Sequence, residues 1–394
     1  MKRERRALSQ HGGRIRRGGH PEASAALAAA FERAAAESPD RFTHAFHSYP
    51  GRMHPSLAAE VIARFADPGE LVVDPFAGSG TVPIEAMIAG LSAIGVDRNP
   101  LAVRLARVKA RPIDDAERGF LVALVRDVAE RSEERVRARV DVRAPLSREE
   151  ARFYDGHVLK ELAGLREEIL EVTSDSEDAR ELLLMVFSAI VVKFSRQESE
   201  TREDVAPRRL RKGLVTEFFA RKALETIERA TALGRALPPG APEPRFVEAS
   251  ALDLPRVLRR ERADLIFTSP PYGGVYDYRD QHARRYPWLD IDPSAMTREE
   301  LGARRKLHRR DDLGRWDDEV LAMLEAFTRA LSRDGRVVLM VGDAIIGGEL
   351  VPAETQIARL APEVGLVPIA HASEERTPFR GRPREEHLVY LERA

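Results

Sequence analysis

The sequence contains no cysteine. This absence excludes disulfides, iron–sulfur clusters, cysteine zinc sites and any mechanism that needs a thiolate nucleophile. The ten histidines are dispersed and no His-Glu-x-x-His pair occurs, so no metal is expected. No apolar run is long enough to cross a bilayer, and the basic start lacks the apolar segment of a signal peptide. We therefore expect a cytoplasmic protein without membrane association.

The chain also lacks an excess of charge of either sign. Its formal net charge is −1 at pH 7, which gives no global attraction to nucleic acid, so a polyanionic partner would have to be held by local patches. With 394 residues and 43% hydrophobic content, the chain is long enough for one large domain with an insertion or for two domains.

Strand and helix patterns alternate in two blocks, separated by residues 113–240, where long charge-rich helical stretches occur without a strand pattern. The alternation predicts an α/β fold, a doubly wound, mostly parallel, seven-stranded Rossmann-like sheet with an all-helical insertion. Residues 1–20, with clustered arginines and four glycines, look disordered. The seven strands are expected at 70–76, 92–99, 245–250, 264–269, 335–343, 365–372 and 386–393, the last two suited to a hairpin.

A glycine-containing loop follows the first predicted strand. The loop, DPFAGSGT at 74–81, brings backbone N–H groups and small residues to the start of a helix, where a ligand can approach closely. Asp97 ends the next strand, a position from which a carboxylate accepts hydrogen bonds from ribose hydroxyls. Because the loop matches neither the three-glycine dinucleotide motif nor a phosphate-binding P-loop, we expect a nucleoside with a small polar tail.

The stretch VVDPFAGSGTVPIEA resembles the S-adenosylmethionine motif of amino-methyltransferases that act on DNA, and HSYPGRMHPSL at 47–57 resembles the segment that closes over the methionine end in that family. The resemblance implies a methyltransferase sheet with S-adenosylmethionine as cofactor. It also implies roles: residues 78–81 and Asp74 would line the methionine portion, Asp97 would hold the ribose, and Asp253 would reach the adenine amine. The cofactor-binding residues expected in all are His54, Pro55, Asp74, Pro75, Phe76, Ala77, Gly78, Ser79, Gly80, Thr81, Asp97, Arg98, Asp253 and Thr268.

The stretch TSPPY at 268–272 ends another buried strand, so it should face the same crevice. Its prolines remove two N–H donors and leave carbonyls that can only accept hydrogen bonds, which suits an amine substrate. SPPY resembles the catalytic motif of N4-cytosine methyltransferases, whereas N6-adenine enzymes usually begin this motif with Asp or Asn. We expect Ser269 Oγ and the Pro270 carbonyl to accept from the base amine and Tyr272 to stack on a base rotated out of the duplex. The predicted catalytic residues are Ser269, Pro270, Pro271 and Tyr272.

Two basic stretches, at 201–213 and 298–310, are candidates for phosphate contacts. The segment 272–289 also looks like the stretch after the catalytic motif in some bacterial DNA methylases. The partner is expected to be double-stranded DNA, with RNA not excluded. The nucleic-acid-binding residues expected from these segments are Tyr276, Tyr278, Arg304, Arg305, Lys306, Arg309, Arg310, Arg208, Arg209 and Arg211.

These patterns divide the chain into four parts. Residues 1–40 would form a basic arm and a helix, 41–112 the S-adenosylmethionine-binding half, 113–240 the helical insertion and 241–394 the catalytic half. Most enzymes with Ser-Pro-Pro-Tyr have the catalytic motif first, so the order here leaves the place of target recognition open; the insertion is a candidate for recognition or for homodimer formation. The alternatives to an N4-cytosine enzyme are an N6-adenine DNA methyltransferase, an RNA base amino-methyltransferase and a non-catalytic specificity module that binds nucleic acid.

Overall fold

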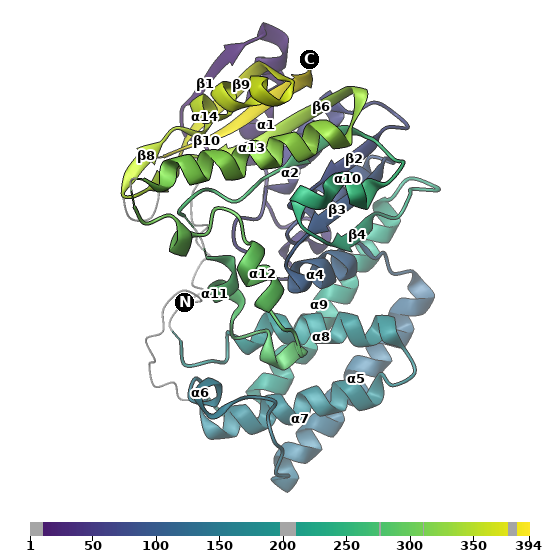
Figure 1. The fold of residues 1–394 in the computed structure, drawn as a ribbon. Helices are drawn as coiled ribbons and strands as arrows, with labels where there is room; N and C mark the ends of the chain where they lie inside the picture. Colours follow the sequence, from purple (N-terminus) through teal and green to yellow (C-terminus); the bar gives the residue numbers. More distant parts are fainter. Residues whose placement is uncertain (1–10, 198–209, 276, 310, 377–383) are drawn as a thin grey trace.

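The computed structural model describes residues 11–197, 210–275, 277–309, 311–376 and 384–394. They form a lobe built on a large sheet and a second lobe made of helices, with α11 and α12 lying between the two lobes (Figure 1). None of the described helices combines the length and the apolar character that a membrane span requires. The predicted α/β fold with an all-helical insertion is confirmed.

The main sheet has the strand order β1-β9-β10-β6-β5-β2-β3-β4. The five strands from β6 to β4 are parallel, whereas β10 runs antiparallel to both β6 and β9. The predicted seven strands and the terminal hairpin are therefore all present. Their bounds are β2 (Leu71–Asp74), β3 (Ser92–Asp97), β4 (Arg245–Glu248), β5 (Ala263–Thr268), β6 (Leu331–Gly342), β9 (Leu366–Arg376) and β10 (Arg384–Arg393).

An eighth strand, β1 (Ile15–Gly19), pairs antiparallel with β9 at the edge of the sheet. The prediction that residues 1–20 are disordered is therefore wrong for this strand, whose partner lies more than 350 residues away in the sequence. Local composition could not reveal the pairing, because the strand's stability comes from hydrogen bonds to β9 and not from its own residues. A separate small hairpin consists of β7 (Ala344–Ile346) and β8 (Glu349–Val351).

Helices cover both faces of the sheet because neighbouring strand residues point to opposite sides. Val73 and Ile266 pack with α10, α13 and α14, whereas Val72 and Leu265 pack with α1 and α2. The helices of this lobe are α1 (Pro21–Ala36), α2 (Pro55–Phe65), α3 (Thr81–Ile88), α4 (Pro100–Ala110), α10 (Leu254–Leu258), α13 (Asp312–Ala330) and α14 (Ala353–Leu360). Short 3-10 turns are η1 (Phe42–Ala45), η2 (Ala251–Asp253) and η5 (Ala361–Val364).

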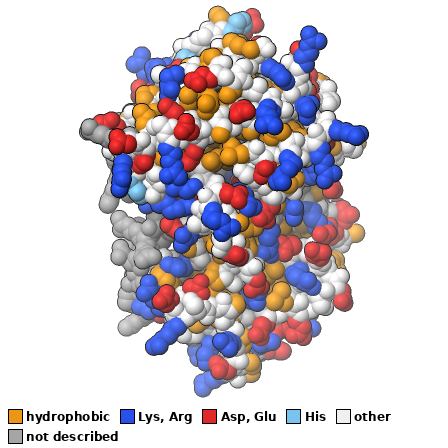
Figure 2. Space-filling view, in the orientation of Figure 1, with side chains coloured by type: hydrophobic (Ala, Val, Ile, Leu, Met, Phe, Trp, Pro, Cys, Tyr) orange, Lys and Arg blue, Asp and Glu red, His pale blue; other side chains and the backbone are white. Residues whose placement is uncertain are grey.

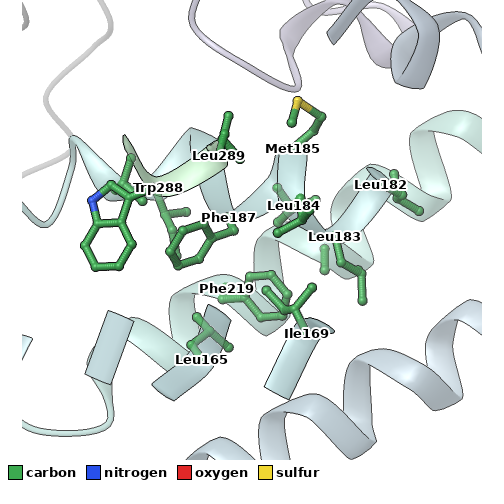
Figure 3. Close-up of a cluster of buried hydrophobic side chains, with 14 of the residues drawn as sticks. Leu165, Ile169, Leu182, Leu183, Leu184, Met185, Phe187, Phe219, Trp288 and Leu289 are labelled. Carbon is green, nitrogen blue, oxygen red and sulfur yellow. The ribbon is translucent and has the colours of Figure 1, made fainter. Parts of the chain in front are cut away.

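The helical lobe lies between α4 and β4 in the chain, where the insertion was expected. Its helices pack their apolar faces on one another, so the faces that suggested homodimer formation mostly form an internal core (Figure 3). Trp288 and Leu289, which lie outside the insertion in the segment that contains α11 and α12, are part of the same core. The helices are α5 (Asp115–Ala138), α6 (Arg148–Ala151), α7 (Gly156–Val172), α8 (Glu177–Val191) and α9 (Leu214–Ala236).

Candidate active site

A cavity of about 900 Å³, partly open to solvent, lies at the carboxyl ends of β2, β3 and β5. This volume includes space that is open to solvent. One wall comes from the glycine loop and the end of β3, the other from the end of β5 and from a segment at 277–309, hereafter the roof. The roof contains α11 (Tyr278–His282), η3 (Pro287–Leu289), α12 (Ser294–Glu299) and η4 (Arg304–Lys306).

Asp97 stands at the end of β3 with both carboxylate oxygens directed at backbone donors. Oδ2 accepts from the N–H of Gly78 at 2.8 Å, and Oδ1 accepts from the N–H of Asn99 at 2.8 Å. Burial raises the pKa of Asp97 to about 6, although these two hydrogen bonds oppose the shift. Each oxygen keeps a second lone pair, so Asp97 can still accept from ligand hydroxyls in the cavity.

Asp74, at the end of β2, is a buried carboxylate of the same cavity. Its Oδ1 accepts from the Thr268 hydroxyl at 2.6 Å and from the Phe76 N–H at 3.1 Å. Burial raises its pKa to about 7, and the nearby Asp97 contributes to the same shift. No described residue hydrogen-bonds to Oδ2. Two carboxylates with raised pKa in one cavity favour a ligand that carries positive charge and hydroxyl donors.

Ser269 and Pro271, from the other wall, line the same cavity as the glycine loop. Ser269 is half-buried, and its side chain forms no hydrogen bond with the described part of the chain. The two loops that the sequence analysis expected to converge are therefore adjacent, although about 190 residues separate them in the sequence.

Tyr272 lies outside this cavity. With Pro270 and Trp316 it borders a smaller, mostly apolar pocket between β6 and α13, and Pro271 lines both spaces. The Tyr272 ring packs so closely on Gly342 that a Cβ there would come within 2.6 Å of it. Its hydroxyl donates to Glu386 Oε1 at 3.4 Å. The structure thus brings Ser269, but not Tyr272, to the glycine loop.

The other expected cofactor residues fall into two groups. Some line the cavity, namely Pro75, Phe76, Ala77, Gly78, Ser79, Thr81 and Arg98. Those that do not line it are His54, Pro55, Gly80, Asp253 and Thr268.

Several residues of the second group make their contacts outside the cavity. His54 and Pro55 begin α2, where His54 Nδ1 accepts from the Ser56 N–H at 3.2 Å. Gly80 has φ +85°, and a Cβ there would lie 2.9 Å from the Cβ of Ala106, so glycine permits close packing on α4. Asp253 is turned away and pairs with Arg256 at 3.3 Å, whereas its neighbours Ser250 and Ala251 reach the cavity.

The roof is held over the cavity by ion pairs and hydrogen bonds. Arg98 donates from Nε to Glu299 Oε2 at 2.6 Å and from Nη2 to Oε1 at 3.2 Å. Arg305 pairs with Glu300 at 2.6 Å and with Asp277 at 3.3 Å. The Arg98 pair joins the roof to the end of β3. The Arg305 pairs join the beginning of the roof, at Asp277, to the part near its end.

The expected nucleic-acid residues lie in several environments. Arg304 and Arg309 are exposed, and Arg304 pairs with Asp277 at 3.4 Å. Lys306 donates to the carbonyl oxygens of Glu300 at 2.6 Å and Arg298 at 3.2 Å, so like Arg305 it serves the roof itself. Arg211 is exposed and pairs with Glu217, and Tyr278 lines the cavity. Tyr276, Arg310, Arg208 and Arg209 lie outside the described residues.

Acidic and basic side chains are interspersed over the face drawn in Figure 2, in keeping with the balanced composition. A nucleic acid on this face would therefore meet local contacts and not a field of one sign. Among the described residues no group of three or more side chains is placed to hold a metal ion.

The sequence analysis missed several residues that line the cavity. Tyr49 belongs to the quoted closing segment but was not singled out; its ring stacks on His282 with centroids 4.9 Å apart. Asn99 was recoverable from the sequence, because it stands two residues after Asp97 and directly before the proline that begins α4, where its side chain caps the helix. Met296, Glu299 and Glu300 had no sequence signal, since only the path of the roof brings them to the site.

Comparison with known proteins finds similarity to DNA methylases in the part of the chain that holds the glycine loop. Residues 29–108 match the family model described as DNA methylase. Type II methyltransferase M.MjaII from Methanocaldococcus jannaschii is 32% identical over 85 residues, which are 22% of this chain and 16% of that protein. Type II methyltransferase M.MvaI from Kocuria varians is 37% identical over 78 residues, or 19% of this chain and 17% of that protein. The matches thus span about one sixth of the length of these curated relatives.

Two solved structures are also similar in part. TrmN from Thermus thermophilus has a TM-score of 0.34 at 13% identity, with 92% of this chain and 52% of that chain covered. The rRNA methyltransferase aviRa from Streptomyces viridochromogenes has a TM-score of 0.33 at 15% identity, with 87% and 88% covered. Scores at this level say nothing about substrate. The match to the DNA methylase model covers the glycine loop and Asp97, the part of the chain in which the sequence resembles DNA amino-methyltransferases.

Proposed function

We propose that the chain transfers a methyl group from S-adenosylmethionine to the N4 amine of a cytosine rotated out of duplex DNA. The observation that carries the proposal is the shared cavity of Ser269, Asp74 and the glycine loop. The family match covers the cofactor half of this cavity, and the names of the curated relatives point to the same reaction class. The choice of N4-cytosine depends on Ser269 at the head of the SPPY motif.

The residues fit the proposed cofactor. The cavity provides carboxylate acceptors for a cationic ligand with ribose hydroxyls, and the apolar side chains of Phe76, Met53 and Met296 beside them suit an adenine ring and a thioether chain. In this assignment Asp97 accepts from the ribose hydroxyls and Asp74 faces the charged methionine end. When bound, S-adenosylmethionine supplies an electrophilic methyl carbon on its sulfonium.

The other wall would prepare the amine. The lone pair of an exocyclic base amine is delocalised into the ring, and two acceptors on its hydrogens favour a pyramidal nitrogen with an exposed lone pair. Ser269 Oγ, which forms no hydrogen bond with the described residues, and the Pro270 carbonyl are assigned as these acceptors. Tyr272, which lines the neighbouring pocket, is assigned to the face of the base. Exposed Arg304, Arg309 and Arg211 are assigned to phosphates, and the helical lobe to target recognition.

The test is transfer of labelled methyl from S-adenosylmethionine to duplex DNA, followed by nucleoside digestion. N4-methylcytosine is the expected product; N6-methyladenine, or labelling of structured RNA alone, would overturn the cytosine assignment. Cofactor binding without transfer to any nucleic acid would instead support a non-catalytic specificity module.

A variant then tests the proposed site. Ser269→Ala should lower kcat by about 10²- to 10³-fold, because one transition-state contact is lost, while binding of S-adenosylhomocysteine remains. Ser174→Ala, at an exposed loop of the helical lobe, is the matched control and should leave the rate unchanged. Full activity in Ser269→Ala would contradict the site.

A further inference from the structure

Lys109, in the last turn of α4, has a fully buried side chain directly beneath the glycine loop. Its Nζ donates to Ser79 Oγ at 2.9 Å. In the described part of the chain no ion pair joins this amine to a carboxylate, and Ser79 is the only hydrogen-bond partner of Nζ. The amine thus has a single polar contact, and that contact is a side chain of the cofactor cavity.

The surroundings of Lys109 do not favour a charged amine. Burial lowers its pKa well below the ordinary value, and the guanidinium of Arg52 acts in the same direction. The helix end is fixed separately, because the Thr43 hydroxyl donates to the Lys109 carbonyl at 2.7 Å. A buried amine costs folding free energy that an apolar side chain of similar length would not cost. The benefit of Lys109 is therefore expected to come from its contact with Ser79.

Ser79 is the one side chain between two glycines of the loop. Gly78 and Gly80 both have positive φ, at +50° and +85°, so this stretch is shaped by backbone and offers a single hydroxyl to the cavity. A serine hydroxyl accepts two hydrogen bonds and donates one. When Nζ of Lys109 donates to Oγ, the hydroxyl hydrogen remains for an acceptor in the cavity.

We propose that Lys109 is a positioning residue for the cofactor: its amine orients the Ser79 hydroxyl so that the hydroxyl donates to the carboxylate of the methionine end. This inference rests on the proposed function, since it requires a ligand with such a carboxylate in the cavity. Lys109 touches neither the methyl carbon nor the base. Its effect is on ground-state binding, which is the same before and during transfer.

Two ligands that differ only at the amino-acid end test the proposal by calorimetry. S-Adenosylhomocysteine has the carboxylate, whereas 5′-methylthioadenosine lacks the whole amino-acid end. Lys109→Met should weaken binding of S-adenosylhomocysteine by about tenfold and change binding of methylthioadenosine by less than about twofold. A merely structural role of Lys109 would weaken both ligands alike, and that result would overturn the proposal.

A double-mutant cycle with Ser79→Ala tests the coupling between the two residues. Each single variant and the double variant should lose about the same affinity for S-adenosylhomocysteine, because all three lack the same oriented hydroxyl. Multiplicative losses would overturn the proposal. If Lys109→Met does not fold, Lys109→Leu takes its place, since its loss must also be confined to the ligand with the carboxylate.

Controls and kinetics separate this inference from the proposed function. Arg107→Met, at an exposed position on the same helix, should bind both ligands as the parent does. In the transfer assay Lys109→Met should raise KM for S-adenosylmethionine about tenfold with kcat unchanged, and a fall in kcat at saturating cofactor would contradict the positioning role. If the parent binds neither ligand, the proposed function fails; if the parent binds both and Lys109→Met matches it, only the inference on Lys109 fails.

Discussion

The two walls of the cavity are built in different ways. In the cofactor wall, each carboxylate accepts from a backbone N–H two residues away, Asp97 from Asn99 and Asp74 from Phe76, and Asp74 accepts in addition from the distant Thr268 hydroxyl. The opposite wall is held by contacts across long stretches of chain, such as Arg98 with Glu299, about 200 residues apart. The cofactor wall thus combines local hydrogen bonds with pairing between neighbouring strands, whereas the roof depends on how the lobes come together.

Trp288 shows how strongly the roof depends on the helical lobe. Its buried ring lies 5.5 Å from that of Phe187, and its Nε1 donates to the Tyr154 hydroxyl at 3.1 Å. Arg166 donates to the Trp288 carbonyl at 2.8 Å. The insertion therefore anchors the segment that covers the cavity, as the placement of Trp288 and Leu289 beside Phe187 in Figure 3 shows. A change inside the helical lobe should reach the site through this anchor.

Of the changes that test the difference between the two walls, removal of the Trp288 ring should have the largest effect. Trp288→Ala should lower the free energy of unfolding by about 3–5 kcal/mol, because it empties a fully buried site and removes a hydrogen bond. Chemical denaturation measures this loss. The control Phe120→Ala, at a position that is 51% exposed, should change stability by less than about 0.5 kcal/mol. Equal, small losses in both variants would show that the roof does not need the helical lobe.

A change in the cofactor wall should spare the fold and affect the ligand. Asp97→Asn should weaken binding of S-adenosylhomocysteine by about 10- to 100-fold, because a charged acceptor of the ribose is lost. Isothermal titration calorimetry checks this value, with Asp318→Asn on an exposed face of α13 as the control. Retention of parental affinity would remove Asp97 from the ribose assignment.

The affinity of the cofactor wall for its ligand should depend on pH, because both of its carboxylates have raised pKa values. The pKa of Asp74 is raised to about 7 and that of Asp97 to about 6, so both carboxylates are ionised above pH 7 and become protonated between pH 7 and 5. Affinity for the cationic cofactor should therefore rise from pH 5 to pH 8. Binding isotherms at several pH values check this, and Asp74→Asn should lose the part of the rise near pH 7. An affinity that is flat across this range in the parent would contradict the assignment of both groups.

Stability of the ligand-free protein should follow the opposite trend. A carboxylate whose folded-state pKa is raised contributes stability that is fully present below its unfolded pKa, about 4, and is lost as the pH rises through 6 to 7. Asp74→Asn should consequently gain Tm relative to the parent at pH 8 but not at pH 4. Differential scanning calorimetry at the two pH values decides, and equal Tm differences would rule out titration of Asp74 as the cause.

The smallest effect is expected at the exposed ion pair between the walls. Glu299→Gln should speed dissociation of S-adenosylhomocysteine by no more than about fivefold, because exposed pairs contribute little and salt screens them. Stopped-flow dissociation should show the parent approaching the variant at high salt. A much larger effect would mean that this pair, and not the packing around Trp288, holds the roof in place.

The features that could be predicted from the sequence are the regular strands and helices and the glycine loop, and those that could not be predicted lie mostly in the roof. The seven strands and the helical insertion followed from periodicity, and the loop at 74–81 from its motif, because each depends on neighbouring residues. Met296 and Glu300 reach the cavity only through the path of the roof. Lys109 read as an ordinary residue of an amphipathic helix, and only the packing of α4 under the glycine loop revealed its contact with Ser79.

The sequence by itself determined seven strands of the sheet, the helical insertion and the residues of the glycine loop, since apolar spacing and short-range hydrogen bonds depend on contiguous residues. Tertiary structure decided that β1 completes the sheet edge, that Tyr272 faces the neighbouring pocket and that the roof rests on the helical lobe. These features depend on pairs of groups hundreds of residues apart, whose encounter is set by the packing of the whole chain and not by any one stretch of it.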